Sequence, residues 1–164
     1  NRSGTSEASG QSGSTARDAG TDDGPREASS ASGTHTLTEE RGLALLREAF
    51  QTASVQGTPE RRIELANGQS FVVDLAITSG RYGVEFVSTQ DEATIGLSLP
   101  ERRSANALVT FRGYGRDADF TVLVLRASEY RYDAQAAGSL QAAEDRLRQA
   151  VTGYFHYLRQ HGNL

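Results

Sequence analysis

Between residues 61 and 88, apolar and polar positions alternate, and each break in the alternation contains a glycine. The pattern predicts three short antiparallel strands. A three-residue turn over 66–68, with Gly68 left-handed, joins the first two strands, and a two-residue turn at 79–80 joins the second to the third. The second turn sets three apolar pairs on one face: Ile77 with Tyr82, Leu75 with Val84 and Val73 with Phe86. We therefore expect one face of this sheet nucleus in the core and the other in solvent.

Two helices, each with an apolar face, are predicted on either side of the strands. The first covers about 37–54, and Thr36 with Glu39 matches a capping box at its start. The second covers about 139–161 and ends before Gly162. Its apolar stripe consists of Leu140, Leu147, Val151, Tyr154, Phe155 and Leu158. Because burying such a stripe supplies on the order of 10 kcal/mol, we expect this helix to pack on the sheet.

The stretch between the sheet nucleus and the last helix predicts one short helix and further strands. Ser88 caps a helix that runs to about Ile95. Strands follow at 107–111 and 120–126, and the second is apolar on both faces, which indicates a covered central position. Residues 129–133 extend that strand or form an edge. The order α-β-β-β-(α)-β-β-α predicts an α+β domain with a mainly antiparallel sheet of about five strands and helices packed on one face.

Residues 1–36 differ from the rest of the chain in composition. They are rich in Ser, Gly, Thr, Ala and Asp and contain no Leu, Ile, Val, Phe or Tyr. Such a segment buries too little apolar surface to offset the entropy of ordering. We expect a disordered tether over 1–36 and a single folded domain over 37–164. A chain without methionine that begins at Asn1 indicates a processed or trimmed product.

This N-terminal composition resembles the mature start of a bacterial lipoprotein, in which a Ser/Gly/Asp-rich spacer follows a lipidated cysteine. The resemblance implies a signal peptide removed before Asn1 and a lipid anchor in the cell envelope. With the segment TVLVLRASEYRYD and the arginine-rich last helix, the chain is similar to small uncharacterised lipoproteins of myxobacteria, a group that implies no activity. Another kind of exported fragment and a trimmed cytoplasmic protein with a loose tail are the alternatives.

Composition removes several kinds of chemistry. All 17 basic residues are arginine, which excludes a P-loop and a lysine Schiff base, and the lack of cysteine excludes thiol catalysis and disulfides. The net charge is −4, and the pairs Arg61-Arg62 and Arg102-Arg103 are too few to neutralise many phosphates. We expect no nucleic-acid partner and no cofactor. No apolar run approaches the roughly 18 residues of a membrane span.

Asp74 and Glu85 are the candidate metal ligands. The predicted register sets them opposite each other, and opposed like charges require a compensating cation. The order of elements, with Asp74 followed by Glu85-Phe86-Val87, is similar to that of the PD-(D/E)xK nuclease superfamily. That resemblance implies a degenerate metal site, because Val87 stands where the family has lysine. The alternative is a solvated face that Arg62 neutralises.

Other motifs are less specific. The run GYGRDAD at 113–119 lacks the following helix of a phosphate-binding loop and has few calcium ligands, so it predicts a hairpin loop. His35, His156 and His161 do not have the spacing of zinc ligands on one helical face. The serine-hydrolase motif GxSxG does not occur.

The final candidate is an interaction surface of aromatic and arginine side chains, residue types that are favoured at binding hot spots. Its members are Tyr130, Arg131, Tyr132, Tyr157 and Arg159. An ordinary amphipathic surface is the alternative. The element order is also similar to type III secretion chaperones and the YbjN-like family, which implies protein binding. We expect a non-enzymatic envelope protein with a protein partner, and a nuclease-like enzyme is the competing hypothesis.

Overall fold

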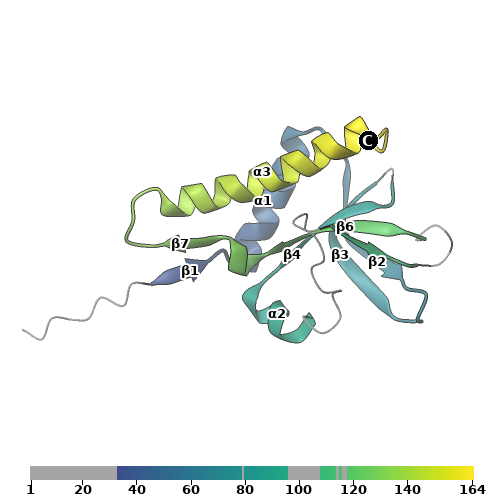
Figure 1. Cartoon of the computed structure of the whole chain (residues 1–164), viewed down its shortest axis with the longest axis horizontal. Coiled ribbons are helices and arrows are strands. Elements are labelled where there is room, and N and C mark those ends of the chain that lie inside the picture. Colours follow the sequence, from purple (N-terminus) through teal and green to yellow (C-terminus); the bar gives the residue numbers. More distant parts are fainter. Residues whose placement is uncertain (1–32, 79, 96–107, 114, 116–117) are drawn as a thin grey trace, which may run out of the picture. The chain divides into compact units, whose positions relative to one another are not determined.

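The central sheet has five strands in the order β2-β3-β4-β6-β5 (Figure 1). Its strands are β2 (Gly57–Glu64), β3 (Ser70–Ile77), β4 (Tyr82–Val87), β5 (Leu108–Phe111) and β6 (Phe120–Arg126). Neighbours are antiparallel except β4 and β6, which run parallel. The computed structural model describes residues 33–78, 80–95, 108–113, 115 and 118–164. These elements confirm the predicted α+β class and the mainly antiparallel sheet.

The first hairpin and the central strand agree with the sequence. Gly68 has a φ of 82°, and the Leu65 amide donates to the Gln69 carbonyl at 2.8 Å, which closes the predicted three-residue loop. Leu75 pairs with Val84 as expected. Strand β6 lies between β4 and β5, so the predicted central position of 120–126 is confirmed.

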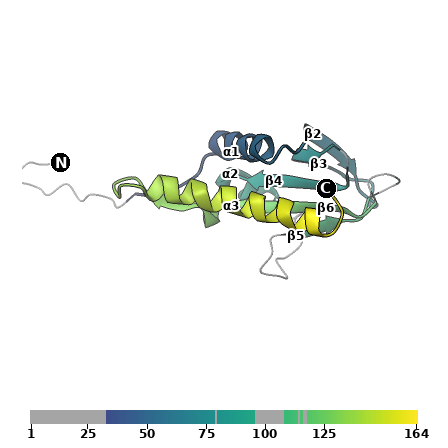
Figure 2. The same ribbon diagram turned by 90° about the horizontal axis from the view of Figure 1, so that it is seen from above.

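Helices α1 (Glu39–Thr52) and α3 (Ser139–Gln160) lie side by side over one face of the sheet (Figure 2). Their contact includes Phe50 and Phe155, whose rings meet edge to face with centroids 4.9 Å apart. Most of the predicted α3 stripe is buried, but Leu140 is 43% exposed and lies outside the core. None of the described helices is long and apolar enough to cross a bilayer.

The short helix α2 (Thr89–Ile95) begins as the sequence predicted. The Ser88 hydroxyl accepts a hydrogen bond from the Asp91 amide at 3.1 Å and donates one to the Asp91 carboxylate at 2.6 Å. A 3₁₀ turn, η2 (Ala127–Glu129), leads from β6 towards the last strand.

The structure extends further towards the N-terminus than predicted. Strand β1 (Thr34–Thr36) pairs antiparallel with β7 (Arg131–Asp133) in a separate two-stranded sheet, so 34–36 are not part of a tether. The rest of the predicted tether lies outside the described residues. The predicted cap is also wrong, because Thr38 accepts the capping hydrogen bond from the Arg41 amide while the Thr36 hydroxyl bonds to the Thr89 hydroxyl.

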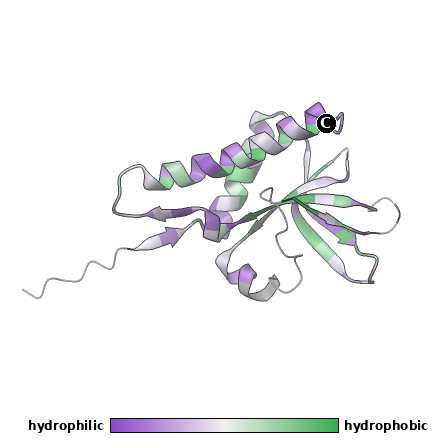
Figure 3. Cartoon of the chain, viewed as in Figure 1, coloured by the Kyte–Doolittle hydropathy of each residue, from purple (hydrophilic) through white to green (hydrophobic). Residues whose placement is uncertain are grey.

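The sheet has a buried cluster on its second face too, so the expected solvated face is wrong. The cluster contains Ile63, Val73, Ala76, Val87, Phe111, Phe120, Val122 and Val124. The sheet curls over it: Leu65 forms a bridge with Gly113, and the Phe71 and Phe111 rings stack with centroids 4.8 Å apart. Apolar side chains are therefore buried on both faces of the sheet, and Figure 3 shows apolar positions along its strands.

Strand β3 changes sides along its length. Leu75 and Ile77 pack under the helices, whereas Val73 belongs to the second cluster, although the three residues have the same parity. The pairing of β2 with β3 is interrupted between Pro59–Leu75 and Arg61–Val73, where Glu60 of β2 has a φ of 50°. The expected grouping of Val73 with Leu75 on one face is wrong, because the two side chains are buried in different clusters.

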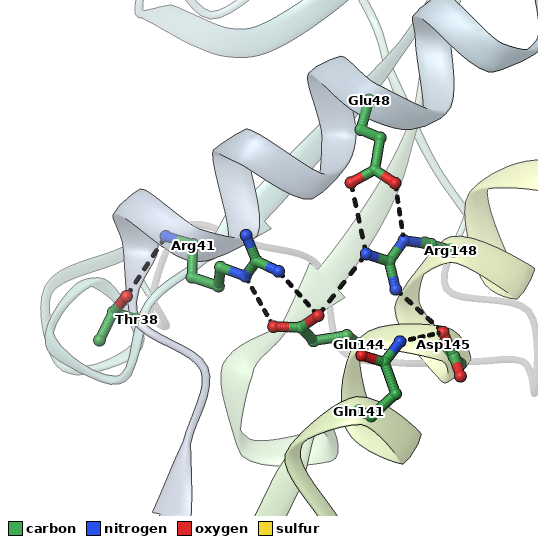
Figure 4. A network of polar contacts seen from close by, with 7 residues as sticks. All are labelled: Thr38, Arg41, Glu48, Gln141, Glu144, Asp145 and Arg148. Atoms are coloured by element: carbon green, nitrogen blue, oxygen red, sulfur yellow. Dashed lines mark hydrogen bonds and ion pairs between the residues drawn. The ribbon is translucent and has the colours of Figure 1, made fainter. Parts of the chain in front are cut away.

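A network of charged residues joins the two long helices (Figure 4). Arg41 of α1 donates two hydrogen bonds to the carboxylate of Glu144 in α3, at 2.6 and 2.8 Å. Arg148 lies 3.5 Å from the same carboxylate and also pairs with Glu48 and Asp145. Glu144 is only 4% exposed, so these partners compensate for its loss of water.

Candidate functional site

The structure brings Asp74 of β3 and Glu85 of β4 together, as the sequence predicted. The Asp74 amide donates to Glu85 Oε2 at 2.9 Å, and the Phe86 amide donates to Asp74 Oδ2 at 2.7 Å. Each carboxyl group thus satisfies a backbone amide of the paired strands. The backbone ladder between β3 and β4 is short, with the pairs Leu75–Val84 and Ala76–Gly83. The two side chains therefore replace part of the hydrogen bonding that a regular ladder supplies.

Burial makes both carboxyl groups poor acids. Glu85 is 7% exposed, and burial, followed by the negative charge of Asp74, raises its pKa to about 8. Asp74 is half-buried, and burial raises its pKa to about 6 against the opposing effect of its hydrogen bond from the Phe86 amide. The charges of Glu39 and Asp91 raise both pKa values further. The pair therefore holds protons close to neutral pH.

The expected neutralisation by Arg62 is wrong. The Arg62 side chain is directed instead to Glu64, 3.3 Å away, and to the Ser70 hydroxyl at 2.7 Å. Both members of its ion pair are well exposed, whereas Glu85 is buried. The predicted relative position of Asp74 and Glu85 is correct, but their predicted surroundings are wrong, because the curled sheet buries a face that was expected to be in solvent.

Two carboxyl groups alone are an incomplete set of metal ligands. Within the described residues, no three His, Cys, Asp or Glu side chains are grouped so that they could hold a metal ion. The oxygens Oδ2 of Asp74 and Oε2 of Glu85 are already engaged by backbone amides. Acid–base catalysis needs a substrate within hydrogen-bonding distance of the reacting group, and these carboxyls are held between two strands.

The predicted aromatic surface is not a single patch. Tyr130 is 6% exposed and belongs to the core, so it is removed from that surface. Tyr132 stacks on His35 at the β1–β7 pair, with ring centroids 5.6 Å apart. Tyr157 is 45% exposed near the opposite end of α3, where its ring lies 4.2 Å from that of His161.

The two arginines of that predicted surface bind backbone carbonyls. Arg131 donates to the Ser128 carbonyl at 3.0 Å, and Arg159 donates to the Ala53 carbonyl at 2.7 Å. Arg131 thus binds the η2 turn, whereas Arg159 binds the C-terminal end of α1. The five residues were grouped by composition, and the 22-residue length of α3 separates them.

A polar groove that the sequence analysis missed lies where the start of β2, the β3–β4 turn and the end of α3 meet. Its volume is about 1110 Å³. The lining residues are Thr58, Arg61, Arg62, Thr78, Gly80, Arg81, Tyr82, Asp119, Gly162, Asn163 and Leu164. The adjacent Arg61 and Arg62 were visible as a basic pair, but Arg81 joins them only through the fold. Asp119 brings one residue of the GYGRDAD run to the groove, while positions 114, 116 and 117 of that run lie outside the described residues.

Three contacts orient two of the arginines at this groove. Arg61 donates to the Gly80 carbonyl at 3.2 Å, and its guanidinium carbon lies 5.0 Å from the centre of the Phe120 ring. Arg81 donates to the Ala118 carbonyl at 3.2 Å. Backbone carbonyls and an aromatic face thus help to orient these two arginine side chains at the groove.

Comparisons with protein-family models, with curated proteins and with solved structures found no match to this chain.

Proposed function

We propose that this protein is a non-enzymatic binding module that is attached to the bacterial cell envelope through its N-terminal segment and acts by contact with a protein partner. The observation that supports binding most directly is the open polar groove, whose lining includes Arg61, Arg62 and Arg81. Asp74 and Glu85, the most strongly perturbed acids, do not line this groove. The buried acid pair therefore lies outside the groove to which we assign binding.

The envelope part of the proposal is supported by the composition of the N-terminal segment. A Ser/Gly/Asp-rich stretch without large apolar residues precedes the first strand at Thr34. Its composition is typical of a flexible spacer between an anchor and a domain. The codons immediately before Asn1 test this part: we expect a cysteine there, preceded by a signal peptide. Codons for an ordinary cytoplasmic start would contradict the envelope assignment.

Site-specific cross-linking tests the binding part. A photoreactive residue is placed at Thr58, on the groove wall, in the full chain produced in its own cells. The control places the same residue at Gln141, an exposed position on α3. We expect a discrete cross-linked protein from Thr58 that is missing from Gln141. Identical products from both positions, or none from Thr58, would count against a binding function at this groove.

A further inference from the structure

The polar groove carries an excess of positive charge in an acidic protein. Among the described residues of its lining, Arg61, Arg62 and Arg81 outnumber the one acidic side chain, Asp119, whereas the whole chain has a net charge of −4. The positive charges come from two separate segments, strand β2 and the β3–β4 turn. The fold therefore concentrates cations that are dispersed in the sequence, which directs an anionic ligand to this place.

Arg62 and Arg81 are the two arginines best placed to meet a ligand. Both residues are exposed, and Arg81 uses one terminal nitrogen for the Ala118 carbonyl. A guanidinium has five N–H donors, so one such bond leaves most of its donors for other partners. Arg62 pairs with Glu64, but the two side chains are 69% and 59% exposed, and such a pair adds little stability. A ligand carboxylate can displace it at small cost.

The remaining lining is polar. Thr58 and Thr78 contribute hydroxyls that lie 3.1 Å apart, and Tyr82 and Asn163 add further polar atoms. Large apolar side chains at this groove are few, so an apolar helix or an apolar small molecule would bury little surface there. Planar guanidinium groups match the two oxygens of a carboxylate, and the hydroxyls can donate to further oxygens. An extended chain with several carboxylates fits this lining.

We infer that the groove binds an acidic, extended segment of a protein partner, with Arg62 and Arg81 as the principal carboxylate contacts. This inference rests on the proposed binding function and specifies the chemistry of the partner. The negative charge elsewhere on the chain repels an acidic partner. The partner is therefore directed to the groove and away from the rest of the protein surface.

Fluorescence anisotropy tests the inference with the full chain and a labelled oligoglutamate peptide as the probe. We expect saturable binding that weakens as salt is raised, and weaker binding of the matched oligoglutamine peptide. Arg62→Gln and Arg81→Gln should each reduce the affinity by about tenfold, the factor that corresponds to a lost charge-assisted hydrogen bond. The control variant is Arg131→Gln, because Arg131 is equally exposed and also donates to one backbone carbonyl. It should bind the probe as wild type does.

Three outcomes of this experiment would contradict the inference. Equal loss of affinity in Arg81→Gln and Arg131→Gln would mean that the peptide responds only to total charge. Arginine-dependent binding of inorganic polyphosphate or of phosphatidylglycerol vesicles, without binding of oligoglutamate, would assign the groove to phosphate groups. If oligoglutamate does not bind but the Thr58 cross-link is still formed, the binding function stands and the acidic partner is excluded. Unchanged circular dichroism melting curves confirm that the variants are folded.

Discussion

The Asp74 amide and the Glu85 carboxylate are hydrogen-bonded to each other across the β3–β4 pair at 2.9 Å. The return contact is made by the Asp74 carboxylate and the Phe86 amide, at 2.7 Å. Two acidic side chains thus complete a strand pair, and they do so where burial disfavours their charged forms. Proton uptake and strand pairing are linked in this part of the fold.

The first prediction is that stability falls as the pH rises from about 4 to about 8. Burial raises the pKa of Glu85 from 4.5 to about 8 and that of Asp74 from 3.8 to about 6. The folded protein therefore retains protons that the unfolded chain has released, and the stability gained is largest at low pH and lost by about pH 8. Each retained proton changes the free energy of unfolding by about 1.4 kcal/mol per pH unit. Urea denaturation across this pH range measures the effect.

Glu85→Gln provides the matched test, because glutamine keeps an oxygen to accept from the Asp74 amide but cannot ionise. We expect the variant to be more stable than wild type at pH 8 by at least about 1 kcal/mol and to show a smaller pH slope. Glu64→Gln is the control, since that carboxylate is 59% exposed. A Glu85→Gln protein that is less stable than wild type at pH 8 would show that the Glu85 charge supports the fold. The charge of Asp91 on α2 raises the pKa of both acids, whereas Arg47 on α1 lowers that of Asp74.

The second prediction is that magnesium and manganese do not bind at the acid pair. Calorimetric titration of wild type and Asp74→Asn should give the same small heats, because the described residues provide no third ligand beside Asp74 and Glu85. Saturable binding by wild type that is lost in Asp74→Asn would support the competing nuclease-like hypothesis instead.

The third prediction concerns two glycines with opposite surroundings. A Cβ at Gly83 would lie 2.7 Å from Val73 Cγ1 and 3.1 Å from the Leu75 carbonyl oxygen, so Gly83→Ala should destabilise the fold by about 1–3 kcal/mol. At Gly153 in α3, no atom lies within 4 Å of such a Cβ. Gly153→Ala should stabilise the helix by about 0.5–1 kcal/mol. Thermal melts of the two variants should shift in opposite directions; a shared direction would contradict the close packing at Gly83.

The fourth prediction tests the packing of α3. Leu147 is fully buried, and Leu147→Asp should unfold the domain because it places an unpaired charge in the core. Leu140 is 43% exposed on the same helix, and Leu140→Asp should change the free energy of unfolding by no more than about 0.5 kcal/mol. Circular dichroism melting measures both. An unchanged melt for Leu147→Asp would contradict the position of α3 over the sheet.

Local sequence patterns predicted the features that depend on neighbouring residues. The turn at Gly68 and the cap at Ser88 follow from the conformational needs of single positions, and both are present. Pairing of Leu75 with Val84 followed from the length of one turn. These features involve few residues, so alternation and turn chemistry were enough to place them.

Features that join distant segments could not be predicted in this way. An edge strand was predicted within 129–133, where β7 lies, but its partner β1 has only three residues and lies far away in the chain, so the pairing left no recognisable pattern. The bridge between Leu65 and Gly113 helps the sheet to curl and to bury its second face. An alternation of apolar and polar residues does not predict such a curl. Glu60 adopts a positive φ although it is not glycine, so the sequence carries no signal for the point at which β3 changes from one cluster to the other. The polar groove could not be predicted either, because Arg81 comes close to Arg61 only in the folded structure.

The pairing of β1 with β7 has a mechanical consequence. A pull transmitted along the preceding residues enters the domain at Thr34, and only three residue pairs, from Thr34–Asp133 to Thr36–Arg131, stand between it and the buried Leu37. Under load this short pair would separate before either hydrophobic cluster opens. Its release would extend the chain in front of Leu37 by roughly 10 Å while the groove keeps its shape.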